Sequence, residues 1–419
     1  MWELIVPTTI TGGGSLTLQA NGAILNAVVA ALDAIVNPNE PTVVLKSKTA
    51  TVPGGANVFF NIPGGGSFTL PVGAEGVVLT GKAATTIDTN VSPFVLVGNQ
   101  GNDTINTDGG SGVIAVGDGL NVINVTGGNE QIFVGNAKDV INMNGGAVTL
   151  GPVPPFQTGS GSKAVVNMIS GANSLTSYDG FSASVSGGVD TISAFNGVHT
   201  ITVAGGSLEL DVESGSNVVH NTGGSVTMNL LGPSGKETVT GGALISQTGG
   251  AYSLNLGGND TINLGSGSDT IVEAGSATLT GGSGSLKFTG GSGSEQLTLG
   301  SGSATVVGGS GANTFLATGG GTASITGGTG TNVFTGGNGG SDTMVGAGTS
   351  DAFTFSTVGG GTFTVKHFVG ADTITVAGYT SAQVLAAATF AGGNTVINLG
   401  GAKITLVGFN LHTGGHIGP

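Results

Sequence analysis

Residues 112–142 read GVIAVGDGLNVINVTGGNEQIFVGNAKDVIN, and they repeat one nine-residue unit. A large apolar residue returns at Ile114, Ile123, Ile132 and Ile141, with glycine in each intervening turn. A fixed short period predicts stacked turns of one unit, in which each turn completes the core of its neighbour. We therefore expect an all-β fold, a right-handed parallel β-roll or β-solenoid with small mixed α/β end segments.

The same nine-residue beat covers most of the chain. It passes through Leu96, Ile105 and Leu150 in one stretch, Ile192, Ile201, Leu210, Val219 and Met228 in a second, and Phe288, Leu297, Val306 and Phe315 in a third. Successive side chains of a strand point to opposite faces, so Ile123 and Val125 share the buried face. If two nonapeptides complete one turn, residues 18 apart stack, and Asn106, Asn124 and Asn142 form an asparagine ladder.

Composition excludes several classes of protein. The chain has 84 Gly in 419 residues but no G-X-Y period, and with 38% hydrophobic and only 8% charged residues it does not resemble a disordered chain. A formal charge of −14 with nine basic residues leaves no basic surface for nucleic acid, and we expect no membrane insertion. The absence of Cys excludes a disulfide framework and a zinc–thiolate site.

Breaks in the beat divide the chain into five segments. We expect an N-terminal capping or assembly domain with one helix at residues 1–77, a first coil at 78–151, a second coil with an inserted loop at 152–237, a third, Gly/Ser-rich coil at 238–352, and a C-terminal secretion or capping domain at 353–419.

The N-terminal segment departs from the nine-residue period. Apolar residues at helical spacing predict a helix over residues 21–36, with Asn21 as its N-cap and Asn37-Pro38 as its end. Short strands are expected at residues 4–11, 15–18, 42–45, 58–62 and 67–70. The segment is expected to close one end of the coil; the alternative is that it also docks onto the next molecule.

The C-terminal segment also departs from the nine-residue period. We expect a strand at residues 373–376, a short helix at 381–390 and strands at 394–399 and 402–407. The Gly400-Gly401 pair between the last two has the chemistry of a two-residue hairpin turn.

One stretch carries metal-binding chemistry. Gly98-Asn99-Gln100-Gly101-Asn102-Asp103-Thr104-Ile105-Asn106 matches the calcium-binding nonapeptide G-G-x-G-x-D-x-U-x, where U is large and apolar, at all but the second glycine. Calcium prefers several oxygen ligands at once; glycine-rich turns offer carbonyls and Asp offers charge. Matching Asp residues recur at Asp260 and Asp269, and again at Asp342 and Asp351.

On these residues the chain resembles the repeat-in-toxin β-roll proteins, over roughly residues 78–352. The resemblance implies that two nonapeptides make one turn and that calcium lies between stacked loops along each edge. The segment that begins Asp351-Ala352-Phe353-Thr354-Phe355 looks like the tail domain of type I secretion substrates, which implies export by an uncleaved C-terminal signal. The start, Met1 to Thr8, lacks the basic and apolar regions of a cleavable signal peptide, so the protein is either cytoplasmic or exported by a route that reads another part of the chain. Export by such a tail would explain the missing signal.

Most turns depart from the motif at the Asp position, where Glu130, Val148, Leu286 and Ala304 stand. We therefore expect a few calcium sites at most, with candidate ligands Asp103, Asn121, Asp139, Asp260, Asp269, Asp342 and Asp351. The alternative is that these side chains only stabilise turns through hydrogen bonds to the backbone.

The sequence favours a structural function. It has no H-E-x-x-H, no G-x-S-x-G placed between a strand and a helix, and no phosphate loop, so we do not expect an enzyme. A long coil without a passenger domain favours a bacterial extracellular or cell-surface protein that polymerises with itself, as a surface layer, filament or biofilm matrix fibre. Cell-surface polysaccharide is a second candidate partner. The alternative is a calcium-binding secreted adhesin or binding module, which would need intact Asp ladders.

Overall fold

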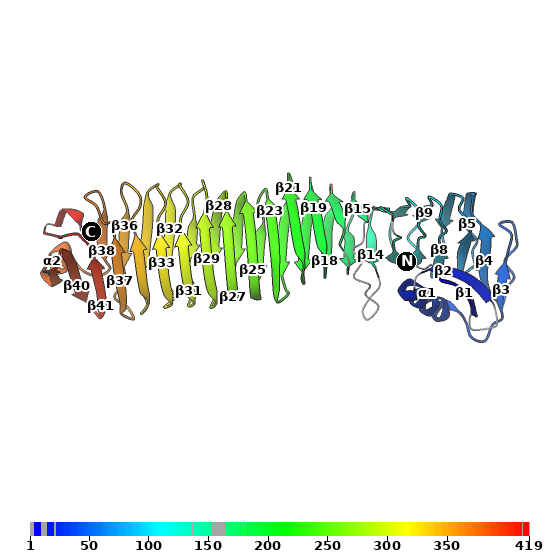
Figure 1. Cartoon of the computed structure of the whole chain (residues 1–419), viewed down its shortest axis with the longest axis horizontal. Helices are drawn as coiled ribbons and strands as arrows, with labels where there is room; N and C mark the ends of the chain where they lie inside the picture. Colours follow the sequence, from blue (N-terminus) through cyan, green and yellow to red (C-terminus); the bar gives the residue numbers. More distant parts are fainter. Residues whose placement is uncertain are drawn as a thin grey trace. The chain divides into compact units, whose positions relative to one another are not determined.

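The computed structural model describes residues 4–9, 15–20, 22–135, 137–151, 164–178, 180–412 and 414–418. Nearly all its regular structure is β-strand, and the chain passes alternately through a strand of a first sheet and a strand of a second sheet (Figure 1). This is a parallel β-solenoid, so the expected fold class is confirmed. The chain divides into two compact units, Met1–Val226 and Thr227–Pro419.

Both sheets of the first unit are parallel ladders. Its first sheet contains β3 (Thr42–Leu45), β4 (Asn57–Pro63), β6 (Gly76–Thr80), β8 (Phe94–Val97), β10 (Gly112–Ala115), β12 (Asn129–Phe133), β14 (Gly146–Leu150), β16 (Asn173–Ser177), β18 (Val189–Ala194) and β20 (Ser207–Val212). Its second sheet contains β5 (Gly66–Leu70), β7 (Thr85–Thr89), β9 (Thr104–Thr107), β11 (Val122–Val125), β13 (Val140–Met143), β15 (Val165–Met168), β17 (Ser182–Val185), β19 (Val198–Val203) and β21 (Ser216–Asn221).

Two nonapeptides make one turn in this unit, as the spacing predicts. Ile105 pairs with Ile123, and Ile123 pairs with Ile141 in the next turn. All three side chains are fully buried, because every second residue of each strand points into the coil. The expected break at Pro152 and the expected N-cap Asn21 lie outside the described residues.

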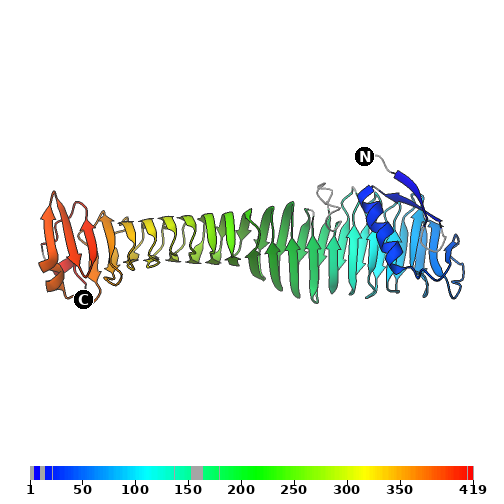
Figure 2. The same cartoon turned by 90° about the horizontal axis from the view of Figure 1, so that it is seen from below.

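Helix α1 (Gly22–Ile35) covers an outer face of the coil (Figure 2). Its buried side chains Leu25, Val28 and Leu32 pack with the outward-facing Phe59 and Val95 of the first sheet. Strand β8 is consequently buried on both faces and reads as a continuous apolar run, FVLV. The helix of the expected capping segment therefore covers the side of the coil, and β3 of the same segment is the first strand of the coil.

The coil begins earlier than residue 78. Strand β3 already pairs in parallel with β4, and β4 with β6. Strands β1 (Leu4–Thr9) and β2 (Ser15–Ala20) pair antiparallel and form a separate two-stranded sheet. No helix in the described part of the chain is long and apolar enough to cross a bilayer.

The second unit continues the same plan. Its first sheet contains β22 (Ser225–Leu230), β24 (Leu244–Gln247), β26 (Asn259–Asn263), β28 (Ser276–Thr280), β30 (Gln296–Thr298), β32 (Asn313–Ala317), β34 (Asn332–Gly336), β36 (Ala352–Phe355) and β38 (Thr373–Val376). Its second sheet contains β23 (Ser234–Thr240), β25 (Gly249–Gly257), β27 (Ser266–Glu273), β29 (Ser285–Gly290), β31 (Ser303–Val307), β33 (Thr322–Thr326), β35 (Ser341–Val345), β37 (Gly361–Lys366) and β41 (Ala402–Leu406).

A column of aromatic rings fills the end of this second core. Ring centroids lie 5.3 Å apart between Phe315 and Phe334, 4.7 Å between Phe334 and Phe353, and 5.8 Å between Phe353 and Phe368. These distances suit offset or tilted aromatic contacts, which stabilise a core beyond the area they bury.

The C-terminal end changes to antiparallel pairing. Strand β40 (Asn394–Leu399) pairs with β41 across Gly400-Gly401, whose φ values of 56° and 89° fit the expected two-residue turn. Helix α2 (Ser381–Ala387) begins at a Thr380–Gln383 capping box and ends three residues before the expected residue 390. Its predicted last turn is instead β39 (Ala388–Ala391), which pairs with β40.

Candidate functional site: the polar entry positions

In many strands of the coil, one of the inward-facing side chains is polar. It lies two residues before the central buried apolar residue, as Asp103 does before Ile105, and we call it the entry position. Buried Asp, Asn and Glu side chains stand there in both units, at Asp103, Asn121, Glu130, Asp139, Asn173, Asp190, Asp260, Asp269, Glu295, Asn313, Asn332, Asp342, Asp351 and Asp372.

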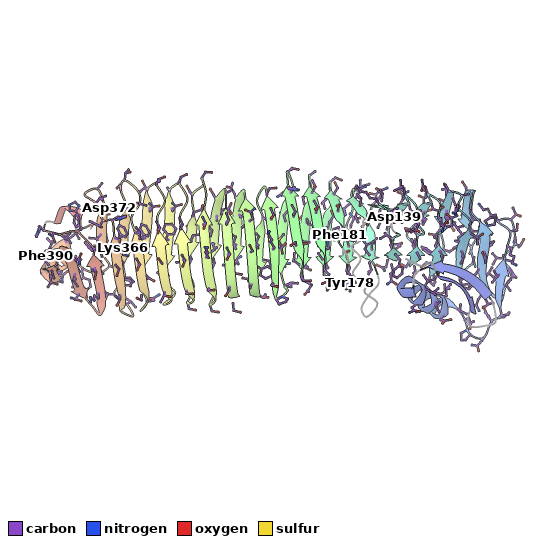
Figure 3. All side chains as sticks on the ribbon, in the orientation of Figure 1. Asp139, Tyr178, Phe181, Lys366, Asp372 and Phe390 are labelled. Atoms are coloured by element: carbon purple, nitrogen blue, oxygen red, sulfur yellow. The ribbon has the colours of Figure 1, made fainter. Side chains whose placement is uncertain are left out.

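In the first unit the structure brings Asp103, Asn121 and Asp139 into one ladder (Figure 3 labels Asp139). The Thr85 N–H donates to Asp103 Oδ1 at 2.8 Å, and the Asp103 N–H donates to Asn121 Oδ1 at 2.9 Å. The Asn121 N–H donates to Asp139 Oδ1 at 3.0 Å. Each side chain therefore satisfies the backbone N–H of the equivalent residue one turn earlier.

A second ladder lies near the C-terminal end, again on one sheet. The Glu295 N–H donates to Asn313 Oδ1 at 3.0 Å, the Asn332 N–H to Asp351 Oδ1 at 3.0 Å, and the Asp351 N–H to Asp372 Oδ1 at 2.7 Å. Asn313 and Asn332 are joined by a 2.9 Å bond from Nδ2 to Oδ1. Asn and Asp serve equally because the position requires an acceptor oxygen and not a charge.

The other candidate ligands stay separate. Asp260 accepts the Ala243 N–H at 2.7 Å on the first sheet, whereas Asp269 accepts the Tyr252 N–H at 3.1 Å on the second. Asp342, on the second sheet, accepts the Ala323 N–H at 2.9 Å. A spacing of nine residues thus puts neighbouring aspartates on opposite sheets rather than into one site.

This arrangement is the geometry of a backbone cap. One oxygen of each candidate ligand already accepts a backbone N–H. At Asp139 the second oxygen, Oδ2, also accepts the Gly135 N–H at 3.0 Å, whereas Oδ2 of Asp260 and of Asp342 has no hydrogen-bond partner. No three His, Cys, Asp or Glu residues within the described ranges stand where they could hold a metal ion. The hydrogen bonds therefore favour the turn-stabilising alternative, and calcium binding stays a prediction.

Further buried carboxyl groups, outside the calcium motif, act in the same way. Glu295 Oε2 accepts the Ala277 N–H at 2.8 Å and Asp190 Oδ1 accepts the Asn173 N–H at 3.2 Å, although neither residue is among the candidate ligands from the sequence. Both stand two residues before a large apolar residue, Leu297 and Ile192. That spacing, applied without the glycine requirement, would have found them.

Burial strongly perturbs several of these carboxyl groups. It raises the pKa of Glu130 to about 7, of Glu295 to about 7 and of Asp342 to about 6. At Glu130 the effect of burial outweighs the interactions with the Thr107 side chain and with its own backbone N–H, which lower the pKa. These groups hold protons at a pH at which exposed carboxyls are ionised.

Glu273 is the most perturbed of them. It is fully buried at the end of β27, and burial followed by the like charge of Asp260 raises its pKa to about 8. The pKa of Asp260 is raised too, chiefly by burial. Of the two carboxyl groups, Glu273 is therefore the one that keeps its proton at neutral pH.

On the outer face of the coil, the expected asparagine ladder is confirmed, and it is longer than predicted. The amide Nδ2 of Asn124 donates to Asn106 Oδ1 at 2.7 Å, and Nδ2 of Asn142 donates to Asn124 Oδ1 at 2.8 Å. Asp88 and Asn167 continue it at either end, at 2.6 and 2.8 Å. This ladder joins successive turns and has a structural role.

No protein-family model and no curated protein matches the chain. The resemblance to repeat-in-toxin proteins therefore rests on the motif residues and on the β-solenoid alone.

Proposed function

We propose that this chain is a self-assembling bacterial structural protein outside the cell, as a surface layer, filament or biofilm matrix fibre. Type I secretion of a repeat-in-toxin-like chain is the export route that the C-terminal resemblance suggests. Calcium that binds at a few turns would stiffen such a polymer or drive its assembly.

The location of the acidic residues carries the proposal. Of the 21 acidic residues in the described part of the chain 12 are buried, which leaves nine to set against eight basic residues there. The outside of the protein is therefore close to neutral, although the chain has a formal charge of −14. Low surface charge favours association of like molecules, because repulsion between copies is weak.

One strand edge adds support. Within the described residues β39 pairs with β40 along one edge. The other edge of such a strand offers N–H and C=O groups to another chain. The strand has only four residues, so any contact through it is short and needs other surfaces.

Electron microscopy of the purified full chain, first with calcium and then with chelator, tests the proposal. Regular filaments or sheets in both conditions support an assembly held by strand and side-chain contacts. Assemblies that disperse in chelator support the proposal with calcium as the driver. Monomers in both conditions would overturn it and favour the secreted binding module.

A further inference from the structure

The second unit has one outer face without charge. On the eight first-sheet strands from β24 to β38, pairs of side chains point outward in register. We call this set the neutral face; it consists of Leu244, Ser246, Thr261, Asn263, Thr278, Thr280, Gln296, Thr298, Thr314, Leu316, Val333, Thr335, Ala352, Thr354, Thr373 and Thr375.

None of these side chains is charged, none is buried, and nine are threonine. Other outer faces differ. The second sheet of the same unit presents Lys287 and Lys366 outward, and the first sheet of the first unit presents Glu209 and Asp211 on β20. The neutral face is therefore a property of this sheet and not of solenoid surfaces in this chain generally.

Its side chains are ordered by the ladder. Neighbouring strands lie about 4.8 Å apart and outward residues of one strand about 6.6 Å apart, so the face is a regular grid. Threonine has a stiff χ1, which fixes its methyl and hydroxyl groups on that grid. Leu244, Leu316 and Val333 add larger apolar groups.

We infer that the neutral face is the surface on which a second copy of this chain lies, sheet face against sheet face. This inference rests on the proposed assembly and names one of its contacts. Two such faces can approach to about 10 Å and interdigitate small side chains, as packed sheets do, without burying an unpaired charge. A face that meets its own copy forms an isologous contact.

The size of the face fits a contact within a polymer. Eight strands span about 38 Å, and two outward residues with their flanks span about 13 Å, so two copies together bury about 1,000 Å². That is the lower limit for a specific interface. Such a contact is weak for an isolated dimer but adds up when each copy is also held by others.

Charge placed on the face tests the inference. The double variant Thr280→Asp, Thr298→Asp puts two carboxylates on paired positions of neighbouring strands in the neutral face. The control Ser324→Asp, Thr343→Asp does the same on the second sheet. Circular dichroism checks that both fold. We expect the first variant to raise the critical concentration for assembly at least tenfold in sedimentation and the control to change it less than twofold.

The absence of Cys allows a second readout. Thr298→Cys, near the middle of the face, should give covalent dimers with a short bismaleimide, whereas Thr305→Cys should give few. Equal effects of the two acidic variants on assembly, or no effect of the first, would overturn the neutral-face contact. If the wild type still assembles in that case, the proposed function stands. A wild type that never assembles would overturn both.

Discussion

At the scale of single residues, the entry position explains why so many polar side chains are tolerated inside the coil. Each turn of a solenoid leaves backbone N–H groups near its corners without strand partners, and buried unpaired donors are costly. Asp103, Asn121 and Asp139 show the solution, since each accepts a bond from the turn before. Acceptor capacity is the common requirement, so Asp, Asn and Glu interchange along the chain.

Asn121→Ala tests this role. The substitution leaves the buried Asp103 N–H without its acceptor and removes the 2.9 Å bond from Nδ2 to Asp139. We expect a loss of about 2–3 kcal/mol in the free energy of unfolding, measured by denaturant titration. Asn167→Ala, at the end of the outer ladder, should cost about 1 kcal/mol or less; equal losses would argue against a special role of the entry position.

Because of the buried carboxyl groups, we expect the free energy of unfolding to fall as the pH rises. The folded pKa of Glu130 is about 7 against 4.5 for the free side chain. Its contribution is therefore fully present below about pH 4.5 and is lost as the pH rises through 7. Glu273 extends this loss to about pH 8.

Glu130→Gln should remove its share of the pH dependence. We expect the variant to gain up to about 3 kcal/mol over wild type at pH 8 and nothing near pH 4.5, measured by thermal unfolding. Glu209→Gln, which replaces an exposed carboxyl, is the matched control. A wild-type melting temperature that rises from pH 5 to pH 8 would contradict the argument.

At the scale of elements, close stacking of turns decides where glycine is required. A Cβ on Gly117 would collide with the backbone carbonyl of Asn99 in the turn before, and a Cβ on Gly135 would collide with that of Gly117. Gly54 has open space around it. Glycine is thus required where successive turns touch, whereas at other loop positions it can be replaced without a collision.

Gly117→Ala should therefore destabilise the coil, whereas Gly54→Ala should not. We expect about 1–3 kcal/mol for the first, as for overpacked cores, and about 0.5 kcal/mol or less for the second. Hydrogen exchange would show lowered protection of strands β9 to β11 in Gly117→Ala. Unchanged protection there would mean that the turns can separate without cost.

At the scale of the whole molecule, charge is divided between inside and outside. With 12 of the 21 described acidic residues buried, the charge of the described surface is almost balanced, and copies meet little repulsion. The proposed assembly should then depend weakly on ionic strength.

Sedimentation at about 50 and 500 mM salt measures this dependence. Because few exposed charges are available to be screened over a Debye length, we expect the polymerised fraction to stay within a factor of two. A polymer that dissolves at high salt would show that ion pairs hold it, and would contradict the role given to neutral surfaces.

Much of the architecture was predictable because a short period leaves few alternatives. The 18-residue turn, the inward column through Ile105, Ile123 and Ile141, and the outer asparagine ladder all follow from spacing, since register is set once one face must be buried. The hairpin at Gly400-Gly401 follows from the conformations that glycine allows.

Other features depend on contacts between distant residues. The sequence could not show that α1 covers the first sheet, because an amphipathic helix does not specify which face it meets. Nor could it show which way the oxygens of Asp260 and Asp269 point. Periodicity determines which residues stack, whereas the stacked backbone alone determines which N–H groups are left for their side chains to satisfy.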